Sequence, residues 1–334
     1  FGIFVPVYFF SELNEKSMML AESIQAEKKK KCLCIFCGTG ENTASELREE
    51  ARANSFLLFT KSETAYVRTP RHSQVYFEMS ANQDESLSHC RQLIASYTEH
   101  YKDADYSRIK IFLFTEQEEA PLLLHSTDKK GLAVIIVDRY RFFSHDLLFT
   151  HPLYEVLSET DKTISVLIAG SGKLAHSVVK TVLWCGQLGA GYRLKVTLIG
   201  SDATQCEKAM RLDCPELFNG NYSLSFLNVD VTASDFEECL DTHCSDANYV
   251  CVCGDNDELT IHTALYLRAY YLRKDVSAPS KPFIAVEVRD TTKNRMVPEF
   301  AAVGKEHKKH TSLNYNLLPF GGDNLLYSSY ILDY

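Results

Sequence analysis

ISVLIAGSGKLAHSVVKTVLWCG, residues 164–186, joins an apolar run, a glycine turn and an amphipathic segment. The run ISVLIAG predicts a buried β-strand, and the apolar residues after GSG recur at the spacing of one helix face. A strand, a glycine turn and a helix in this order can hold a nucleotide diphosphate. The stretch therefore predicts an α/β domain with a candidate nucleotide site.

The glycine turn has small residues at the three positions where a dinucleotide-binding fold needs them. Gly170 ends the strand, Gly172 lets the backbone approach a diphosphate, and Ala175 takes the close-packing position. The positive end of the helix then faces the ligand. The amides expected to hold the phosphate belong to Ser171, Gly172, Lys173 and Leu174.

The acid that would accept the ribose hydroxyls is expected at the end of the second strand. That strand, KVTLIG, ends at Gly200, which has no carboxylate. Ser201 follows, and Asp202 lies two residues beyond the strand, where we expect it to reach the ligand. The sequence thus indicates a phosphate site and leaves its nucleotide open among NAD, AMP, ATP and a cyclic dinucleotide.

Two further loops complete the predicted ligand crevice, since ligands bind at the carboxyl ends of parallel strands. Asp230 and Val231 follow the third strand, and Gly254 and Asp255 follow the fourth. A helix N-terminal cap is an equal alternative for Asp230. Asp257 fits the cap of the next helix better than a ligand contact.

The same alternation of strands and helices occurs twice. FCGTGENTASEL (36–47) aligns with IAGSGKLAHSVV (168–179), and IFLFTEQEEAPLLL (111–124) aligns with VCVCGDNDELTIHTAL (250–265). The strands are continuous apolar runs, typical of parallel sheets covered on both faces. We therefore predict an α/β protein with two tandem Rossmann-like, doubly wound domains and mostly parallel sheets. The predicted parts are an N-terminal linker and helix (1–30), a degenerate Rossmann-like domain (31–158), a nucleotide-binding Rossmann domain (159–295) and an unplaced C-terminal extension (296–334).

The first copy has a weaker case for a ligand. Its turn, Gly38-Thr39-Gly40, is followed by Glu41, which would point a negative charge toward a phosphate. The acid after its next strand, Glu63, comes late. A structural role is the better interpretation of this turn.

The composition excludes some classes of function. The chain has 334 residues and a net charge of −9, so we expect no nucleic-acid partner, because phosphate neutralisation needs a basic surface. Eleven cysteines lie in apolar strands or singly on helices, typical of reduced thiols in a cytoplasmic protein. Cys32, Cys34 and Cys37 raise the alternative of a metal site. Strand alternation separates Cys37 from the other two, which favours core packing.

FGIFVPVYFF, residues 1–10, is apolar but shorter than the roughly 20 residues that a membrane-spanning helix needs. It is either the tail of a membrane helix or a strand packed on the first domain. Because the first residue is Phe, we expect an internal piece of a longer protein.

Catalytic motifs are sparse. Tyr270 and Lys274 have the Tyr-x-x-x-Lys spacing of short-chain dehydrogenases, but they lie among aromatic core residues directly after the GDND loop. His176 is either a neighbour of the phosphate or a surface histidine. The sequence shows no nucleophile elbow, no HExxH and no clustered carboxylate pair. We therefore expect no enzyme, with an NAD-dependent oxidoreductase and a ligand-free scaffold as the alternatives.

Four segments carry a family resemblance: VLIAGSGKLA, NVDVTASDFEECL, ANYVCVCGDNDELTIHTALYLRAYY and PFIAVEVRD. Their order over about residues 163–290 resembles the TrkA-N or RCK family, nucleotide-binding Rossmann domains that regulate potassium channels and transporters. Gly200, Val229 and Thr260 depart from the family's residues. The resemblance implies a cytoplasmic module that senses NAD or another adenine nucleotide. It also implies a homodimer or higher homo-oligomer and a membrane pore attached beyond the given sequence.

Overall fold

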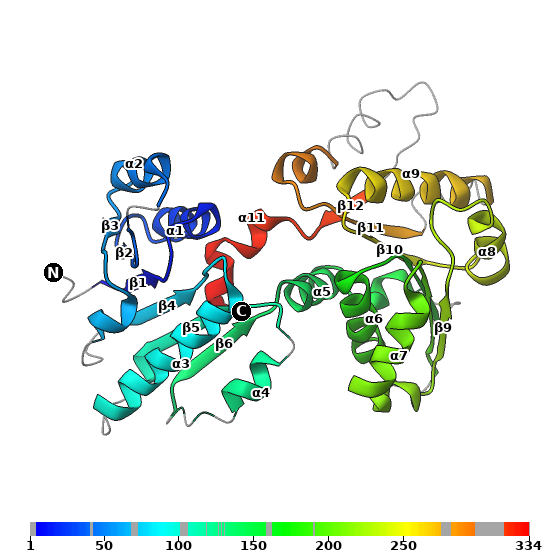
Figure 1. The fold of residues 1–334 in the computed structure, drawn as a ribbon. Coiled ribbons are helices and arrows are strands. Elements are labelled where there is room, and N and C mark those ends of the chain that lie inside the picture. Colours follow the sequence, from blue (N-terminus) through cyan, green and yellow to red (C-terminus); the bar gives the residue numbers. More distant parts are fainter. Residues whose placement is uncertain are drawn as a thin grey trace. The chain divides into compact units, whose positions relative to one another are not determined.

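The computed structural model forms two compact units (Figure 1). The first comprises Phe1–Arg139 with Asn324–Tyr334, and the second comprises Tyr140–Asp323. The structure describes residues 5–40, 43–67, 73–100, 106–117, 119–125, 127, 129, 131–157, 162–189, 191–274, 282–297 and 317–333.

The first unit contains a six-stranded sheet with the order β3-β2-β1-β4-β5-β6. All its neighbouring strands are parallel. Its strands are β1 (Val7–Phe10), β2 (Leu33–Phe36), β3 (Leu57–Leu58), β4 (Gln74–Glu78), β5 (Ile109–Phe114) and β6 (Ala133–Val137). Its helices are α1 (Glu15–Glu27), α2 (Ser45–Ala53), η1 (Glu63–Tyr66), α3 (Gln83–His100), η2 (Tyr106–Arg108) and α4 (Ala120–His125). Helices α1 and α2 lie on one face of this sheet, and α3 and α4 lie on the other.

The second unit contains a six-stranded parallel sheet with the order β12-β11-β10-β7-β8-β9. Its strands are β7 (Thr163–Gly170), β8 (Arg193–Ile199), β9 (Ser223–Leu227), β10 (Tyr249–Cys253), β11 (Phe283–Glu287) and β12 (Leu317–Phe320). The helices of this part of the chain are α5 (Arg139–Thr150), η3 (Leu153–Val156), α6 (Lys173–Cys185), α7 (Ala203–Asp213), η4 (Pro215–Phe218), α8 (Phe236–His243), α9 (Asp257–Lys274) and one over residues 291–297. The chain continues through α11 (Asp323–Leu326) to η5 (Ser329–Asp333) in the first unit.

The prediction of two tandem, doubly wound α/β domains with parallel sheets is confirmed. Both sheets follow one plan, because the strand that comes first in each unit lies in the middle and the order reverses beside it. In the first unit that strand is β1, which pairs with β2 and β4. In the second unit it is β7, which pairs with β8 and β10.

Strand β1 is formed by the apolar run near the N-terminus, inside the stretch that the sequence assigned to a linker. Of the two alternatives for this run, the structure shows the packed strand. The Phe10 ring stacks on Phe36 of β2 at 4.8 Å and on Phe77 of β4 at 5.0 Å between ring centroids. A four-residue strand can occupy the middle of the sheet because both neighbours cover its edges.

The expected alignment of the two copies is wrong by one strand. FCGTGENTASEL follows β2, the second strand of its unit, whereas IAGSGKLAHSVV follows β7, the first strand of its unit. IFLFTEQEEAPLLL likewise begins in β5, but its expected partner begins in β10, the counterpart of β4. Each strand of such a fold leads into a turn and a helix, so glycines alone do not reveal which strand comes first.

Most of the cysteines are buried in the cores, whereas Cys185 is exposed. Cys34, Cys37, Cys251 and Cys253 are buried in or beside the sheets, and all eleven cysteines are free thiols. Burial raises the pKa of Cys37, assisted by the negative charges of Glu63 and Glu78. These side chains pack as small apolar groups.

Candidate functional site

The candidate site lies where β7, β8, β10 and β11 end in the second unit. Gly170 must be glycine, because a Cβ there would lie 1.8 Å from the carbonyl oxygen of Cys253. Gly200 must be glycine too, since its Cβ would lie 2.0 Å from the carbonyl oxygen of Gly170. The missing ribose acid at Gly200 therefore has a steric cause: neighbouring strand ends approach too closely for any side chain.

Asp202 brings a carboxylate back to the glycine turn. Its Oδ2 accepts a hydrogen bond from the backbone N–H of Gly172 at 2.9 Å and lies 3.1 Å from Nε2 of His176. Its Oδ1 is buried and has no hydrogen-bond partner among the described residues. The loop after the second strand thus supplies an acid, two residues later than in the expected pattern.

The turn itself has the geometry of a strand-to-helix connection. Gly172 is the N-cap residue of α6 and has φ of +96°, a conformation that favours glycine. Leu174 and Ala175 are buried against the sheet. Lys173 is exposed and places its Nζ 5.7 Å from the ring centroid of Tyr140. Two further residues were predicted at this site: Ser171 is half-buried, and Ser201 is exposed.

Asp230 and Val231 follow β9 and take no part in any described contact with the glycine turn. Oδ1 of Asp230 accepts hydrogen bonds from the N–H and the hydroxyl of Thr232, at 2.8 and 2.6 Å. These bonds lower the pKa of Asp230. Val231 packs against the core of the unit. Asp235, not Asp230, is the N-cap residue of α8, so Asp230 shapes the turn instead.

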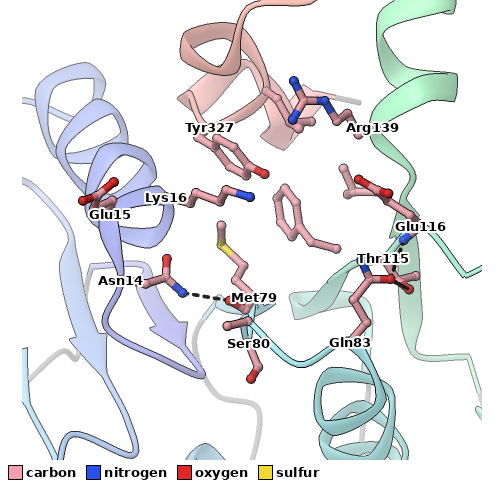
Figure 2. A pocket seen from close by; sticks show the side chains of 14 residues that line it. Asn14, Glu15, Lys16, Met79, Ser80, Gln83, Thr115, Glu116, Arg139 and Tyr327 are labelled. Atoms are coloured by element: carbon pink, nitrogen blue, oxygen red, sulfur yellow. Dashed lines mark hydrogen bonds between the residues drawn. The ribbon is translucent and has the colours of Figure 1, made fainter. Parts of the chain in front are cut away.

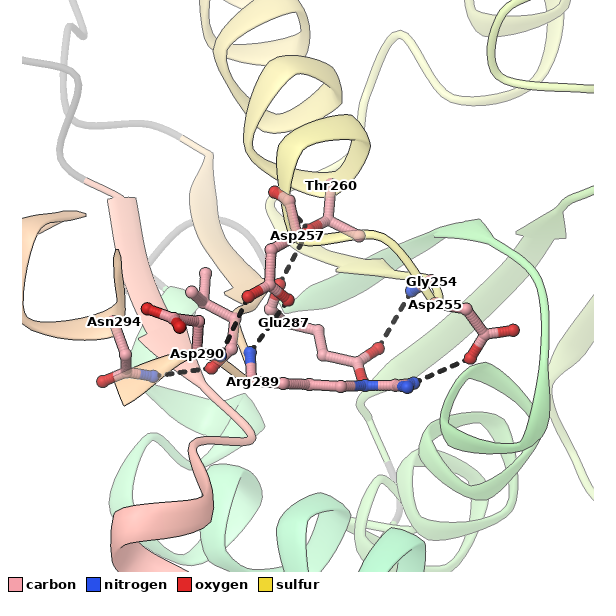
Figure 3. Close-up of polar contacts among 9 residues, drawn as sticks. Gly254, Asp255, Asp257, Thr260, Glu287, Arg289, Asp290 and Asn294 are labelled. Carbon is pink, nitrogen blue, oxygen red and sulfur yellow. Dashed lines mark hydrogen bonds and ion pairs between the residues drawn. The ribbon is translucent and has the colours of Figure 1, made fainter. Parts of the chain in front are cut away.

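A buried carboxylate links the loops after β10 and β11 (Figure 3). Glu287 ends β11 and is 2% exposed. Its Oε2 accepts from the N–H of Gly254 at 2.9 Å, and its Oε1 accepts from Nε of Arg289 at 2.7 Å. The Arg289 guanidinium extends to Oδ1 of Asp255 at 2.8 Å. Burial acts to lower the pKa of Arg289, but the charge of Glu287 and the hydrogen bonds to both carboxylates outweigh it and raise the pKa.

Asp255 also borders the glycine turn. A Cβ at Gly172 would lie 3.7 Å from Oδ2 of Asp255, so the missing side chain of Gly172 leaves room between them. Two carboxylates, those of Asp202 and Asp255, therefore face the turn, with His176 and Arg289 beside them. The Arg289 guanidinium offsets the charge of Asp255, so Asp202 is the carboxylate that opposes an anionic ligand at the turn.

Helix α9 begins differently from the prediction. Oδ1 of Asn256 accepts from the N–H groups of Glu258 and Leu259, so Asn256 caps the helix. Asp257 instead accepts from the backbone N–H groups of Arg289 and Asp290, at 2.9 and 2.8 Å (Figure 3). The cap prediction for Asp257 was wrong because its partners come from another loop.

The roles of Glu287 and Arg289 were missed by sequence reasoning, although their segment, PFIAVEVRD, was part of the resemblance. The signal in the sequence that could have revealed Glu287 is a charged residue at the end of an apolar strand. Thr260, a departure from the family pattern, donates its hydroxyl hydrogen bond to the backbone oxygen of Glu287 at 2.8 Å (Figure 3).

Residues at and after the end of β12 border one side of the candidate site. Phe320 ends β12, and its backbone oxygen accepts from the N–H of Val288 at 2.9 Å. A Cβ at Gly321 would lie 3.3 Å from Cγ of Glu287 and 3.9 Å from Cδ2 of Leu174. Part of the unplaced extension therefore belongs to the second sheet, and its residues 298–316 lie outside the described part.

Tyr270 and Lys274 lie on α9 and both contact Asp241 of α8. The Tyr270 hydroxyl donates to Oδ1 of Asp241 at 2.7 Å, and the Lys274 Nζ lies 2.7 Å from the same oxygen. The Tyr270 side chain is buried. These contacts join two helices on one face of the sheet.

The first unit carries a cavity at the corresponding edge of its sheet (Figure 2). About 340 Å³ in volume, it lies at the ends of β4, β5 and β6 and at the start of α1. Asn14 caps α1 and donates its side-chain amide to the backbone oxygen of Met79 at 3.0 Å. Lys16 Nζ lies 5.5 Å from the ring centroid of Tyr327. The connection from β1 to α1 is SELN, which has no glycine.

The turn Gly38-Thr39-Gly40 does not border this cavity. The N–H of Gly38 donates to the backbone oxygen of Lys61, and that of Thr39 donates to Phe59, both at 3.0 Å. These amides are used within the fold, in keeping with a structural role. Glu41 lies outside the described residues.

No protein-family model matches the chain, and no curated protein sequence matches it. Among solved structures it is similar to a dipicolinate synthase component from Bacillus halodurans, with 8% identity, a TM-score of 0.28, and 84% of this chain and 81% of that chain covered. It is also similar to a dipicolinate synthase component from Bacillus subtilis, with 9% identity, a TM-score of 0.30, and 96% and 89% covered. Likenesses this low carry no inference about function. Within the described residues, no helix combines the length and apolarity that crossing a membrane requires.

Proposed function

We propose that the second unit binds an adenine nucleotide at the turn from Gly170 to Ala175, and that binding regulates an attached protein. The observation that carries the proposal is the position of Asp202. Its Oδ2 is held by the N–H of Gly172 at 2.9 Å, while its Oδ1 has no hydrogen-bond partner among the described residues. A fixed carboxylate with one free oxygen suits a ribose hydroxyl, which can donate to it.

The phosphate would lie at the start of α6. The N–H of Gly172 already donates to Asp202, so the amides of Lys173 and Leu174, which have no acceptor within the helix, would hold it, and the helix dipole favours an anion there. The carboxylate of Asp202 opposes a high negative charge at the same place, whereas that of Asp255 is offset by Arg289. We therefore expect NAD or ADP-ribose to bind more tightly than ATP, because a bridging diphosphate carries less charge than a triphosphate.

The second part of the proposal is that nucleotide binding regulates an attached protein. It rests on the resemblance of residues 163–290 to TrkA-N or RCK domains. A ligand shifts a protein between two arrangements only if it binds them with different affinity. An NAD-dependent oxidoreductase is the second candidate, and it shares the same nucleotide site.

Calorimetry and thermal unfolding with NAD, NADH, ADP-ribose, AMP, ATP and a cyclic dinucleotide would test the proposal. A ligand at 100 times its dissociation constant should stabilise the protein by about 2.7 kcal/mol. Asp202→Asn and Gly172→Asp should remove this stabilisation. Asp213→Asn is the matched control, since Asp213 ends α7 and is exposed.

The outcomes separate the candidates. Binding that Asp202→Asn leaves unchanged would refute the ribose contact, and no binding at all would favour a ligand-free scaffold. Oxidation of bound NADH by a carbonyl substrate would favour the oxidoreductase over the regulatory role.

A further inference from the structure

Three side chains of the first unit converge, two from buried glutamates and one from a partly exposed histidine. Glu63 begins η1, Glu78 ends β4, and His89 lies on α3. Each offers one ligand atom, and these atoms all lie within 4.8 Å of one another. No clustered carboxylate pair is visible in the sequence, because these residues lie far apart in the chain and on different elements.

The two carboxylates are deeply buried. Glu63 is 1% exposed and Glu78 is 0% exposed. None of their four carboxylate oxygens, nor Nδ1 of His89, meets a donor at hydrogen-bond geometry among the described residues, although the Ser11 hydroxyl lies near enough to Glu78 to lower its pKa. An unsatisfied buried polar group costs roughly 1–3 kcal/mol, and more when it is charged. Five such atoms gathered at one place favour a bound partner.

The nearest positive group does not supply that partner. Nδ1 of His89 lies 3.8 Å from Oε1 of Glu63, which is too long for a hydrogen bond. Burial raises the pKa of Glu63, and burial together with the charge of Glu63 raises that of Glu78. A proton shared by the carboxylates would leave the imidazole nitrogen unsatisfied, whereas a cation at the centre would contact all three groups.

We propose that Glu63, Glu78 and His89 bind a divalent transition-metal ion, Zn²⁺ by its ligand preference. Carboxylate oxygen and imidazole nitrogen are both zinc ligands at about 2.0–2.2 Å. In a tetrahedral arrangement, two such ligands lie roughly 3.4 Å apart, close to the 3.8 Å between His89 and Glu63. Three protein ligands leave a fourth position open for water or another ligand.

The site would connect the core of the first unit to its cavity. Glu78 directly precedes Met79 and Ser80, which line that cavity (Figure 2). Metal binding would therefore hold the end of β4 against α3 and η1. This inference does not depend on nucleotide binding by the second unit.

The test uses the full chain, freed of metal by a chelator. Calorimetry with Zn²⁺, Mn²⁺ and Ca²⁺ measures affinity and stoichiometry, and thermal unfolding measures stabilisation. We expect one Zn²⁺ to bind tightly, Mn²⁺ more weakly and Ca²⁺ least. Loss of a ligand in Glu63→Gln, Glu78→Gln or His89→Gln should weaken Zn²⁺ binding beyond the roughly 10- to 100-fold typical of losing an outer hydrogen-bond partner.

The three substitutions are chosen to leave the metal-free protein folded. Replacing a buried glutamate by glutamine retains its volume and removes its charge, so the metal-free variants should stay folded. Glu85→Gln is the matched control, because Glu85 is exposed on α3, one turn from His89. It should bind Zn²⁺ like the unaltered chain.

Eleven cysteines could bind zinc elsewhere, so Co²⁺ provides a second readout. Cobalt at this site should show ligand-field bands without the near-ultraviolet band of thiolate coordination, and Glu63→Gln should abolish them. Thiolate bands alone, or metal binding that none of the three substitutions weakens, would overturn the proposal. Absence of metal binding together with stabilisation by Glu78→Gln would identify a proton-sharing carboxyl pair instead.

Discussion

The carboxylate of Asp202 accepts a hydrogen bond from the backbone N–H of Gly172 at 2.9 Å. The loop after the second strand is thereby joined to the turn after the first. This contact holds an acid at the glycine turn, although Gly200 occupies the position at which the acid was expected. We also expect this hydrogen bond to stabilise the folded protein.

Asp202→Ala should destabilise the protein by about 1 kcal/mol, in the range for losing a side-chain acceptor at a helix N-terminus. Asp202→Asn retains an acceptor oxygen for the N–H of Gly172 and should cost much less. Urea unfolding of both variants measures the difference. Equal losses would show that the charge, and not the hydrogen bond, is what stabilises the turn.

Gly200→Ala should be severely destabilising, because its Cβ would lie 2.0 Å from the carbonyl oxygen of Gly170. Relief of this clash requires the ends of β7 and β8 to separate, at a cost of at least the roughly 1–3 kcal/mol of an overpacked core. Gly40→Ala is the control, since a Cβ there meets nothing within 4 Å. The measurement is thermal unfolding. Melting of both variants at the same temperature as the unaltered chain would contradict this prediction.

Arg289→Met should destabilise the second unit, because it leaves the buried carboxylate of Glu287 without its counter-charge. Breaking one side of a buried ion pair costs roughly 3–5 kcal/mol, and partial exposure of Arg289 places the expected loss near the lower figure. The double variant Glu287→Gln with Arg289→Met should recover part of the loss. A double variant less stable than Arg289→Met, measured by urea unfolding, would refute this account.

Thr232→Val should raise the pKa of Asp230 toward its ordinary value of 3.8, because the Thr232 hydroxyl helps to lower it. A carboxyl whose pKa is lower when folded stabilises the fold above its unfolded pKa. That contribution disappears as the pH falls through the folded pKa. Thr232→Val should therefore lose a small amount of stability at about pH 6 and little at about pH 2. Carboxyl carbon NMR titration gives the pKa, and an unchanged value would contradict the assignment.

Much of the fold could be predicted from local patterns. Continuous apolar runs such as those of β7 and β10 are buried strands wherever they occur, and the run after Gly172 has the spacing of a helix face. Alternation of these elements leads to doubly wound sheets because each helix must cover a sheet face. The turn at Gly170 and Gly172 could be located in the same way.

The partners of individual side chains could not be predicted, because they depend on which strand ends meet. Asp257 binds the backbone after β11 instead of capping its own helix. Glu287 joins two loops whose sequences are more than 30 residues apart.

The sequence alone determined that this protein has two α/β units and that the second contains a glycine turn, since both follow from short-range periodicity. Only the tertiary structure decided that β1 is the first strand of its sheet, that Asp202 reaches Gly172, and that Glu63, Glu78 and His89 meet. The physical reason is the same in each case. Pairing between strands brings together residues that are distant in the chain. The spacing of residues within one segment does not indicate which strands will pair.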